Sequence, residues 1–156
     1  MGSYDKACNS VAAVRFVQEH LKDCELIAKE LDAPLENILG LAASESQYGK
    51  GRIASEYNNY FSMHGPAPLQ SSKVHPQGSS TVWVATYSSF LMSARSFVIR
   101  FGGAVKGKKE PRAFVEALVN AGYNTGSSKS GGTDNYVNKV VDVINMVKRR
   151  MQCSVI

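Results

Sequence analysis

Apolar residues recur at helical spacing in the first third of the chain, and this pattern predicts two helices. The first spans residues 9–31, with a break near Asp23 and Cys24. Its apolar side comprises Val11, Val14, Phe16, Val17, Leu21, Leu26, Ile27 and Leu31. The second opens at Asp32 and Pro34, because aspartate caps helices and proline is tolerated in the first turn. Its buried stripe comprises Leu35, Ile38, Leu39, Ala42 and Ala43, and Gly49 and Gly51 end it.

The middle of the chain has fewer periodic positions. Residues 52–80 are rich in proline, glycine and serine, which indicates loops. Residues 81–87, TVWVATY, form a strand-like run. Ser88 or Ser89 can then cap a helix that ends at Gly102 and Gly103. That helix is expected to bury Leu91, Ala94, Val98 and Phe101.

Two further helices are predicted in the last third. Pro111 opens a short helix that Gly122 closes, with Phe114, Ala117 and Leu118 on one face. Residues 126–132, GSSKSGG, indicate a flexible loop. Thr133 or Asp134 caps the last helix, whose inward positions are Val137, Val140, Val141, Ile144 and Val147. Because no repeat or linker interrupts the chain, we expect one domain over residues 1–156, either all-helical or α+β and mainly α-helical with one small β-hairpin.

The net charge of the chain is +5, and the charged residues are unevenly distributed along it. Residues 1–56 contain 9 acids and 6 bases, and residues 110–156 contain 4 acids and 6 bases. Residues 57–109 contain 6 bases and no acid. The cations at residues 148–150 suit the end of the last helix. The overall balance fits either a plain solvated surface or a polyanionic partner, such as nucleic acid, anionic lipid or a cell-wall polymer.

Several classes of protein are excluded by features that the sequence lacks. No apolar run is long enough to span a membrane, and the start MGSYDKACNS is not a conventional signal peptide, although Met-Gly-Ser can be a cloning scar. Cys8, Cys24 and Cys153 are too scattered for a zinc site, so either they are inert thiols or two of them form a disulfide. His20 and His75 have no partners at ligand spacing. We therefore expect no metal and no cofactor.

The stretch from residue 42 to residue 65, AASESQYGKGRIASEYNNYFSMHG, concentrates the candidate chemistry. Glu45 is predicted near the C-terminal end of an apolar helix, where the helix dipole and burial favour the protonated carboxyl group. Aromatic rings and asparagine amides nearby suit a sugar ligand. The alternative is an ordinary surface glutamate with aromatic residues that serve the core.

This stretch resembles the glucosaminidase domain of glycoside hydrolase family 73, whose pattern is approximately A-x-x-E-S-x-x-G-x-S-x-[IL]-A-x-x-x-N-N-L-F-G-I-K-G. The positions in register are Glu45, Ser46, Gly49, Ile53, Ala54, Asn58, Asn59, Phe61 and Gly65. Ser62 stands where the pattern has glycine, and His64 where it has lysine. A second block resembles residues 83–89, and a third resembles Gly122 to Thr125 followed by Asp134 and Tyr136, with residues 126–133 inserted. The resemblance covers residues 10–150.

The resemblance implies a lysozyme-like fold with a small β-hairpin lobe and cleavage of the bacterial peptidoglycan glycan strand. Glu45 matches the catalytic acid, and Tyr123 matches a supporting catalytic tyrosine. The expected substrate-binding residues are Tyr48, Asn59, Phe61, Tyr87 and Tyr136. Phe61 can instead be a core residue, and Asp134 a helix cap. His64 is either a substrate contact or an ordinary exposed loop histidine.

A second catalytic carboxylate, which glycosidases commonly use, has no candidate in residues 57–109. It must be Glu56, Asp134 or a more remote residue, or it is absent. In the latter case the 2-acetamido group of the substrate can act as the nucleophile. We expect this single-acid mechanism, with Glu45 as acid and then base, cutting between N-acetylglucosamine and N-acetylmuramic acid.

Three other functions compete with this interpretation: a lytic transglycosylase, a degenerate wall-binding module and a nucleic-acid binder, the last unsupported by any motif. A bare catalytic domain also resembles type VI secreted peptidoglycan hydrolase effectors and phage lysis enzymes. For an effector we expect secretion without a conventional signal peptide and action as a toxin in the periplasm or cell wall of a target bacterium. The expected state is a monomer apart from an acidic periplasmic immunity protein that plugs the groove.

Overall fold

The computed structural model describes residues 3–123 and 132–154 and shows a mainly helical domain with one small hairpin. Its elements are α1 (Ser3–Asn9), α2 (Val11–Leu31), α3 (Leu35–Ser46), α4 (Arg52–Tyr57), β1 (Ser72–Val74), β2 (Val84–Thr86), α5 (Phe90–Val105), α6 (Pro111–Asn120) and α7 (Gly132–Arg150). β1 and β2 pair antiparallel, with Lys73 opposite Ala85. The α+β interpretation with one hairpin is therefore confirmed, and the all-helical one is wrong.

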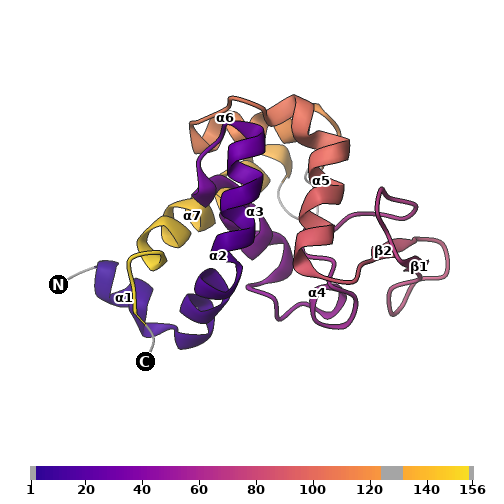
Figure 1. Ribbon diagram of the computed structural model, residues 1–156, viewed down its shortest axis with the longest axis horizontal. Coiled ribbons are helices and arrows are strands. Elements are labelled where there is room, and N and C mark those ends of the chain that lie inside the picture. Colours follow the sequence, from indigo (N-terminus) through magenta and orange to yellow (C-terminus); the bar gives the residue numbers. More distant parts are fainter. Residues whose placement is uncertain (1–2, 124–131, 155–156) are drawn as a thin grey trace.

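The helices surround α3 (Figure 1). α3 packs against α7 and α2, while α5 packs against α2 and α6. The hairpin lies at the opposite end of the molecule from α1. This places the C-terminal end of α3, and the residues that follow it, between the helical body and the hairpin lobe.

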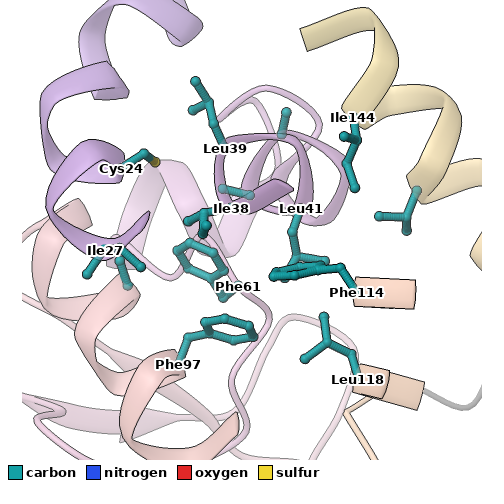
Figure 2. Packing of buried hydrophobic residues seen from close by; sticks show 14 of the residues in the cluster. Cys24, Ile27, Ile38, Leu39, Leu41, Phe61, Phe97, Phe114, Leu118 and Ile144 are labelled. Atoms are coloured by element: carbon teal, nitrogen blue, oxygen red, sulfur yellow. The ribbon is translucent and has the colours of Figure 1, made fainter. Parts of the chain in front are cut away.

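The core lies between α2, α3, α5, α6 and α7, and Figure 2 shows its packing. Phe61 enters it from the segment after α4 and stacks on Phe97 of α5, with ring centroids 5.1 Å apart. Ile38 and Leu41 of α3 are fully buried beside them. Burial of large apolar side chains on this scale is the main term that holds such a domain together.

α3 and α7 approach most closely at Gly40. A Cβ atom added there would lie 2.7 Å from Ile144 Cα, closer than real Cβ contacts come. Glycine is therefore required on α3 for this approach, because any side chain would push the two backbones apart. The approach matters for function, since the two helices carry Glu45 and Tyr136.

Several predicted boundaries are corrected by tertiary structure. α2 runs unbroken through Asp23 and Cys24, because Cys24 faces the core. Asp32 ends α2 in the left-handed conformation, whereas the cap position of α3 is Pro34. α5 continues through Gly102 to Val105, because Gly102 packs against Leu31 of α2.

Other expectations at helix ends are confirmed. Ser89 is the one of the two predicted serines that caps α5, and its Oγ accepts a hydrogen bond from the Met92 backbone amide. Pro111 opens α6 as predicted.

The predicted apolar faces are correct at most positions, but Val11 and Leu26 are 49% and 46% exposed. Exposure of single apolar residues is common on protein surfaces.

Two short elements lie in the region predicted as loops. α4 is six residues long and β1 only three, and β1 is largely exposed. Neither is long enough to show a periodic apolar pattern. Asn124, Thr125 and all but the last residue of the predicted 126–132 loop lie outside the described residues.

A disulfide joins the two ends of the described chain. Cys8 of α1 pairs with Cys153, which follows α7. Arg150 reinforces the junction, because its Nε donates to the Ala7 carbonyl oxygen at 3.0 Å. Cys24 is the buried free thiol, and burial raises its pKa. Of the alternatives left open by the sequence, the structure shows the one with a disulfide between two of the three cysteines.

Within the described residues, no helix combines the length and apolar character needed to cross a membrane.

Candidate active site

Glu45 occupies the last turn of α3, the helix most enclosed by its neighbours. Ser44 and Ser46, on either side of it, are both buried, and Ser46 is tied into the helix end. Ser46 Oγ donates to the Ala42 carbonyl oxygen at 2.6 Å and accepts from the Gly49 amide at 2.9 Å. The chain then turns away through left-handed residues Gln47 and Tyr48. This rigid helix end fixes the direction in which the Glu45 carboxyl group points.

Burial raises the pKa of the Glu45 carboxyl group above its ordinary value. Hydrogen bonds from Tyr136 and Ser62, and the positive charge of Lys139, act in the opposite direction and do not cancel the effect of burial. A carboxyl group that retains its proton toward neutral pH is suited to general acid catalysis. This is the electrostatic state that the sequence predicted for Glu45.

Two tyrosines lie close to Glu45. Tyr136, in the first turns of α7, donates its hydroxyl proton to Glu45 Oε2 at 2.8 Å. Tyr123, after α6, donates to the Phe61 carbonyl oxygen at 2.5 Å. Burial and the Glu45 carboxylate raise the pKa of both tyrosines, so both remain protonated donors. The structure therefore brings together three of the predicted site residues, Glu45, Tyr123 and Tyr136.

Asn59 is buried and supports the site from below its surface. Its Nδ2 donates to the carbonyl oxygens of Met63 and Ala85, at 2.8 and 2.9 Å, and its Oδ1 accepts from the Met63 amide at 2.9 Å. These bonds hold the 61–63 segment against β2. The Asn59 carboxamide therefore makes its hydrogen bonds to backbone groups of the protein. Asn59 positions the segment that contains Ser62 and does not face a groove.

Phe61 and Tyr87 also face inward. Phe61 is 0% exposed and belongs to the core, which is the alternative that the sequence left open. Tyr87 is 4% exposed, and its hydroxyl donates to Ser96 Oγ at 2.8 Å. Both side chains are therefore away from any solvent-accessible groove in this structure.

Tyr48 follows the end of α3 and is held by a residue of α7. Arg150 Nη1 donates to the Tyr48 hydroxyl at 2.6 Å, and the guanidinium lies 5.0 Å from the ring centroid. The other side of the ring meets Phe16 edge-on at 5.7 Å. Tyr48 also lines a hollow of about 320 Å³ with Lys139. Its contacts join α2, α3 and α7 close to the disulfide.

The two candidate second carboxylates are both exposed. Glu56 of α4 pairs with Arg52, with Nε and Oε1 3.9 Å apart. Asp134 lies in the first turn of α7, two residues before Tyr136. Because α7 begins at Gly132, Asp134 lies within the helix and is not the cap that the sequence predicted, although the helix dipole favours a carboxylate in this turn.

A cavity of about 180 Å³ opens beside the partners of Glu45. The residues that line it include Ser62, His64, Arg100, Phe101 and Tyr123. Ser62 adopts a left-handed φ of 53° at the position where the family pattern has glycine. Glu45 does not itself line this cavity, but Ser62 and Tyr123, which do, both interact with Glu45.

The described residues contain no group of three or more histidine, cysteine, aspartate or glutamate side chains that could hold a metal ion. The His20 ring stacks on Phe90, with ring centroids 4.0 Å apart. His75 stacks on Trp83 at 3.7 Å.

Sequence reasoning missed three residues of the site. Ser62 was visible only as a departure from the family pattern, yet its hydroxyl hydrogen-bonds to Glu45. Lys139 lies on α7 three residues after Tyr136, and Arg100 lies on α5. No local pattern distinguishes these two cations from ordinary surface residues, because only the fold brings them to Glu45 and to the cavity.

The chain matches a known protein family over a range that includes these site residues. The Glucosaminidase family model, described as mannosyl-glycoprotein endo-beta-N-acetylglucosaminidase, matches residues 21–149. The match begins within α2 and ends at the last turn of α7, so it includes Glu45, Tyr123 and Tyr136. No curated protein sequence matches the chain.

Solved structures show the same fold. A chain in a type VI secretion system effector-immunity complex from Pseudomonas protegens is 49% identical, with a TM-score of 0.86 over 95% of this chain and 99% of that one. A peptidoglycan hydrolase from Sphingomonas sp. A1 is 22% identical, with a TM-score of 0.70 over 88% of this chain and 92% of that one. The glycoside hydrolase domain of Salmonella typhimurium FlgJ is 24% identical, with a TM-score of 0.63 over 87% and 88% of the two chains.

These structures confirm the lysozyme-like fold that the resemblance implied. Together with the match over most of the chain, they show that the protein belongs to the glucosaminidase family of glycoside hydrolases.

Proposed function

We propose that the protein hydrolyses the β-1,4 bond between N-acetylglucosamine and N-acetylmuramic acid in peptidoglycan, with Glu45 as its catalytic acid. The observation that carries the proposal is the sequestered carboxyl group of Glu45, whose pKa is raised by burial while Tyr136 holds one of its oxygens. Membership of the glucosaminidase family supports the bond type. The Sphingomonas neighbour, a peptidoglycan hydrolase, supports the polymer.

In the first step, Glu45 donates its proton to the glycosidic oxygen as the bond from that oxygen to the sugar C1 breaks. Tyr136 bonds to Oε2, which leaves Oε1 to carry the proton that is transferred. The same hydrogen bond stabilises the carboxylate that remains after transfer. Tyr123 and Ser62 border the space in which the reacting sugar lies.

The second step needs a nucleophile at C1, and we propose that the substrate supplies it. Residues 57–109, which include the hairpin lobe, contain no carboxylate, and Glu56 is exposed and paired with Arg52. The carbonyl oxygen of the 2-acetamido group then attacks C1 to form a cyclic intermediate. The Glu45 carboxylate removes a proton from water, the water oxygen attacks C1, and the acetamido group is regenerated.

We further propose that the protein is an antibacterial effector that acts on the wall of a target bacterium and is neutralised by an immunity protein. The 49% identity to a chain of an effector-immunity complex supports this setting over a phage lysis enzyme. An acid-free lobe next to the site favours an acidic inhibitor. Without the inhibitor the protein is expected to act as a monomer.

Mass spectrometry of digested peptidoglycan tests the reaction. Hydrolysis of the proposed bond produces fragments with reducing N-acetylglucosamine ends. Anhydro-N-acetylmuramic acid ends would instead identify a lytic transglycosylase. Binding to peptidoglycan with no new ends at all would identify a wall-binding module, which the raised pKa of Glu45 and the family match argue against.

A further inference from the structure

We propose that the cavity between Ser62, His64, Arg100 and Tyr123 is a subsite for a carboxylate carried on the 3-O-substituent of a muramoyl residue. The inference rests on the proposed function, because it assigns the muramoyl side of the cleaved strand to this cavity. The two sugars of peptidoglycan share the pyranose ring and the 2-acetamido group. Only the muramoyl residue carries a lactyl group, whose carboxyl is free or extended by a stem peptide.

The cavity lies beside the catalytic acid, because two of the residues that line it also interact with Glu45. Ser62 and Tyr123 line the cavity, and the Ser62 hydroxyl also interacts with the Glu45 carboxyl group. Tyr123 is fixed there by its bond to the Phe61 carbonyl oxygen. A sugar that reaches Glu45 can therefore place a substituent in the cavity. The volume, about 180 Å³, far exceeds the ~10–15 Å³ that a single water requires.

Arg100 supplies a positive charge in the wall of the cavity. Its Nη2 donates to the Pro66 carbonyl oxygen at 3.0 Å, which holds the guanidinium at the cavity. A guanidinium has five N–H donors in a planar fork, and carboxylates are bound by such a fork through two parallel bonds. Among the described residues, no carboxylate forms an ion pair with Arg100, although Arg95 on the same helix pairs with Glu30 at 2.6 Å.

The remaining groups around the cavity also suit an anion. His64 lines it and is exposed, so its ring nitrogens are accessible to a ligand. Phe101 contributes an apolar wall for the lactyl methyl group. No acid occurs anywhere in residues 57–109, which contribute five of the seven lining residues. A bound carboxylate there would meet hydrogen-bond donors, and none of the residues that line the cavity is acidic.

The experiment compares binding of three glycans by calorimetry, with Glu45→Gln in every variant to prevent hydrolysis. The glycans are chitotetraose, a peptide-free tetrasaccharide with free lactyl carboxylates, and the same tetrasaccharide with stem peptides. Arg100→Gln is the test variant. Lys106→Gln is the matched control, because it removes the same charge from the end of the same helix without touching the cavity. Arg100→Lys retains the charge without the planar fork.

We expect Arg100→Gln to weaken binding of a carboxylate-bearing glycan about tenfold or more and chitotetraose less than twofold. Arg100→Lys should show an intermediate loss, and Lys106→Gln none that depends on the glycan. Loss confined to the peptide-free strand identifies the lactyl carboxylate, and loss confined to the peptide-bearing strand identifies the stem. An equal loss for all three glycans, or no loss for any, in a variant with unchanged thermal stability would overturn the subsite.

Digestion of purified peptidoglycan by the protein with Glu45 intact evaluates the proposed function separately. If it digests peptidoglycan and Arg100→Gln shows no selective loss, only the carboxylate subsite is wrong. If it does not digest peptidoglycan and no variant binds any of the glycans, both the function and the subsite are wrong.

Discussion

The Tyr136 hydroxyl of α7 donates a hydrogen bond of 2.8 Å to Glu45 Oε2 at the end of α3. The bond lowers the pKa of Glu45 against the larger raising effect of burial. Removing it by Tyr136→Phe should therefore raise this pKa further. Because the acid must be protonated to act, activity falls as pH rises through its pKa, and the alkaline limb of the pH–rate profile should move to higher pH.

Tyr123→Phe is the control for this shift. Its hydroxyl donates to the Phe61 carbonyl oxygen, so its loss should reduce the rate without moving the alkaline limb. Initial rates of peptidoglycan solubilisation across pH measure both variants. An unmoved limb in Tyr136→Phe, in a folded protein, would show that Glu45 does not set it.

Burial of Glu45 also makes stability depend on pH. Its folded pKa is raised above its ordinary value of 4.5, so the folded state binds the proton more tightly than the unfolded state. Stability is then fully present below the unfolded pKa and falls as pH rises through the folded pKa. Glu45→Gln removes this pH-dependent contribution to stability. The melting temperature of the variant should therefore exceed that of the wild type near neutral pH, and the two should converge below pH 4.5. Thermal melts at several pH values measure the difference, and a pH-independent difference would contradict the raised pKa.

Gly40 should tolerate no side chain. In Gly40→Ala the new Cβ would meet Ile144 Cα at 2.7 Å, so α3 and α7 must separate, at a cost of about 1–3 kcal/mol. Activity should fall too, because these helices carry Glu45 and Tyr136. Gly103→Ala adds the same methyl group where no atom lies within 4 Å, and should stabilise α5 by up to about 1 kcal/mol. Denaturant unfolding distinguishes them; equal effects would show that the α3–α7 approach is not tight.

The disulfide between Cys8 and Cys153 should stabilise the fold. It closes a sequence separation of 145 residues, and its removal by Cys8→Ala with Cys153→Ala should cost about 2–4 kcal/mol. The wild type should lose a similar amount in reductant, whereas the double variant should be insensitive to it. If reductant leaves the unfolding midpoint of the wild type unchanged, the disulfide does not contribute.

The sequence was sufficient to predict the long helices and the family. The apolar stripes of α2, α3 and α7 are long enough to show their period, and the block around Glu45 is specific to the family. By contrast, α4 and β1 are too short for any pattern and form because neighbouring elements provide their partners, as Ala85 does for Lys73.

For the site residues too, the sequence predicts motif positions but not what depends on tertiary structure. Asn59, Phe61 and Tyr87 occupy motif positions, but motif position does not distinguish a groove residue from one that supports the groove. Their burial depends on how α5 and β2 cover the 57–63 segment, which is tertiary information. Arg100 illustrates the opposite case, because it has no motif and is brought to the cavity only by the packing of α5.

The central claim is that Glu45 is the acid and acts without a second carboxylate. Solubilisation of purified peptidoglycan by Glu45→Gln, Glu56→Gln and Asp134→Asn, each confirmed to be folded by its melting curve, tests it most directly. We predict that Glu45→Gln loses at least about 100-fold in rate, the usual scale for general acid catalysis, while the other two variants retain most of theirs. A folded Glu56→Gln or Asp134→Asn that is inactive, or an active Glu45→Gln, would contradict the claim.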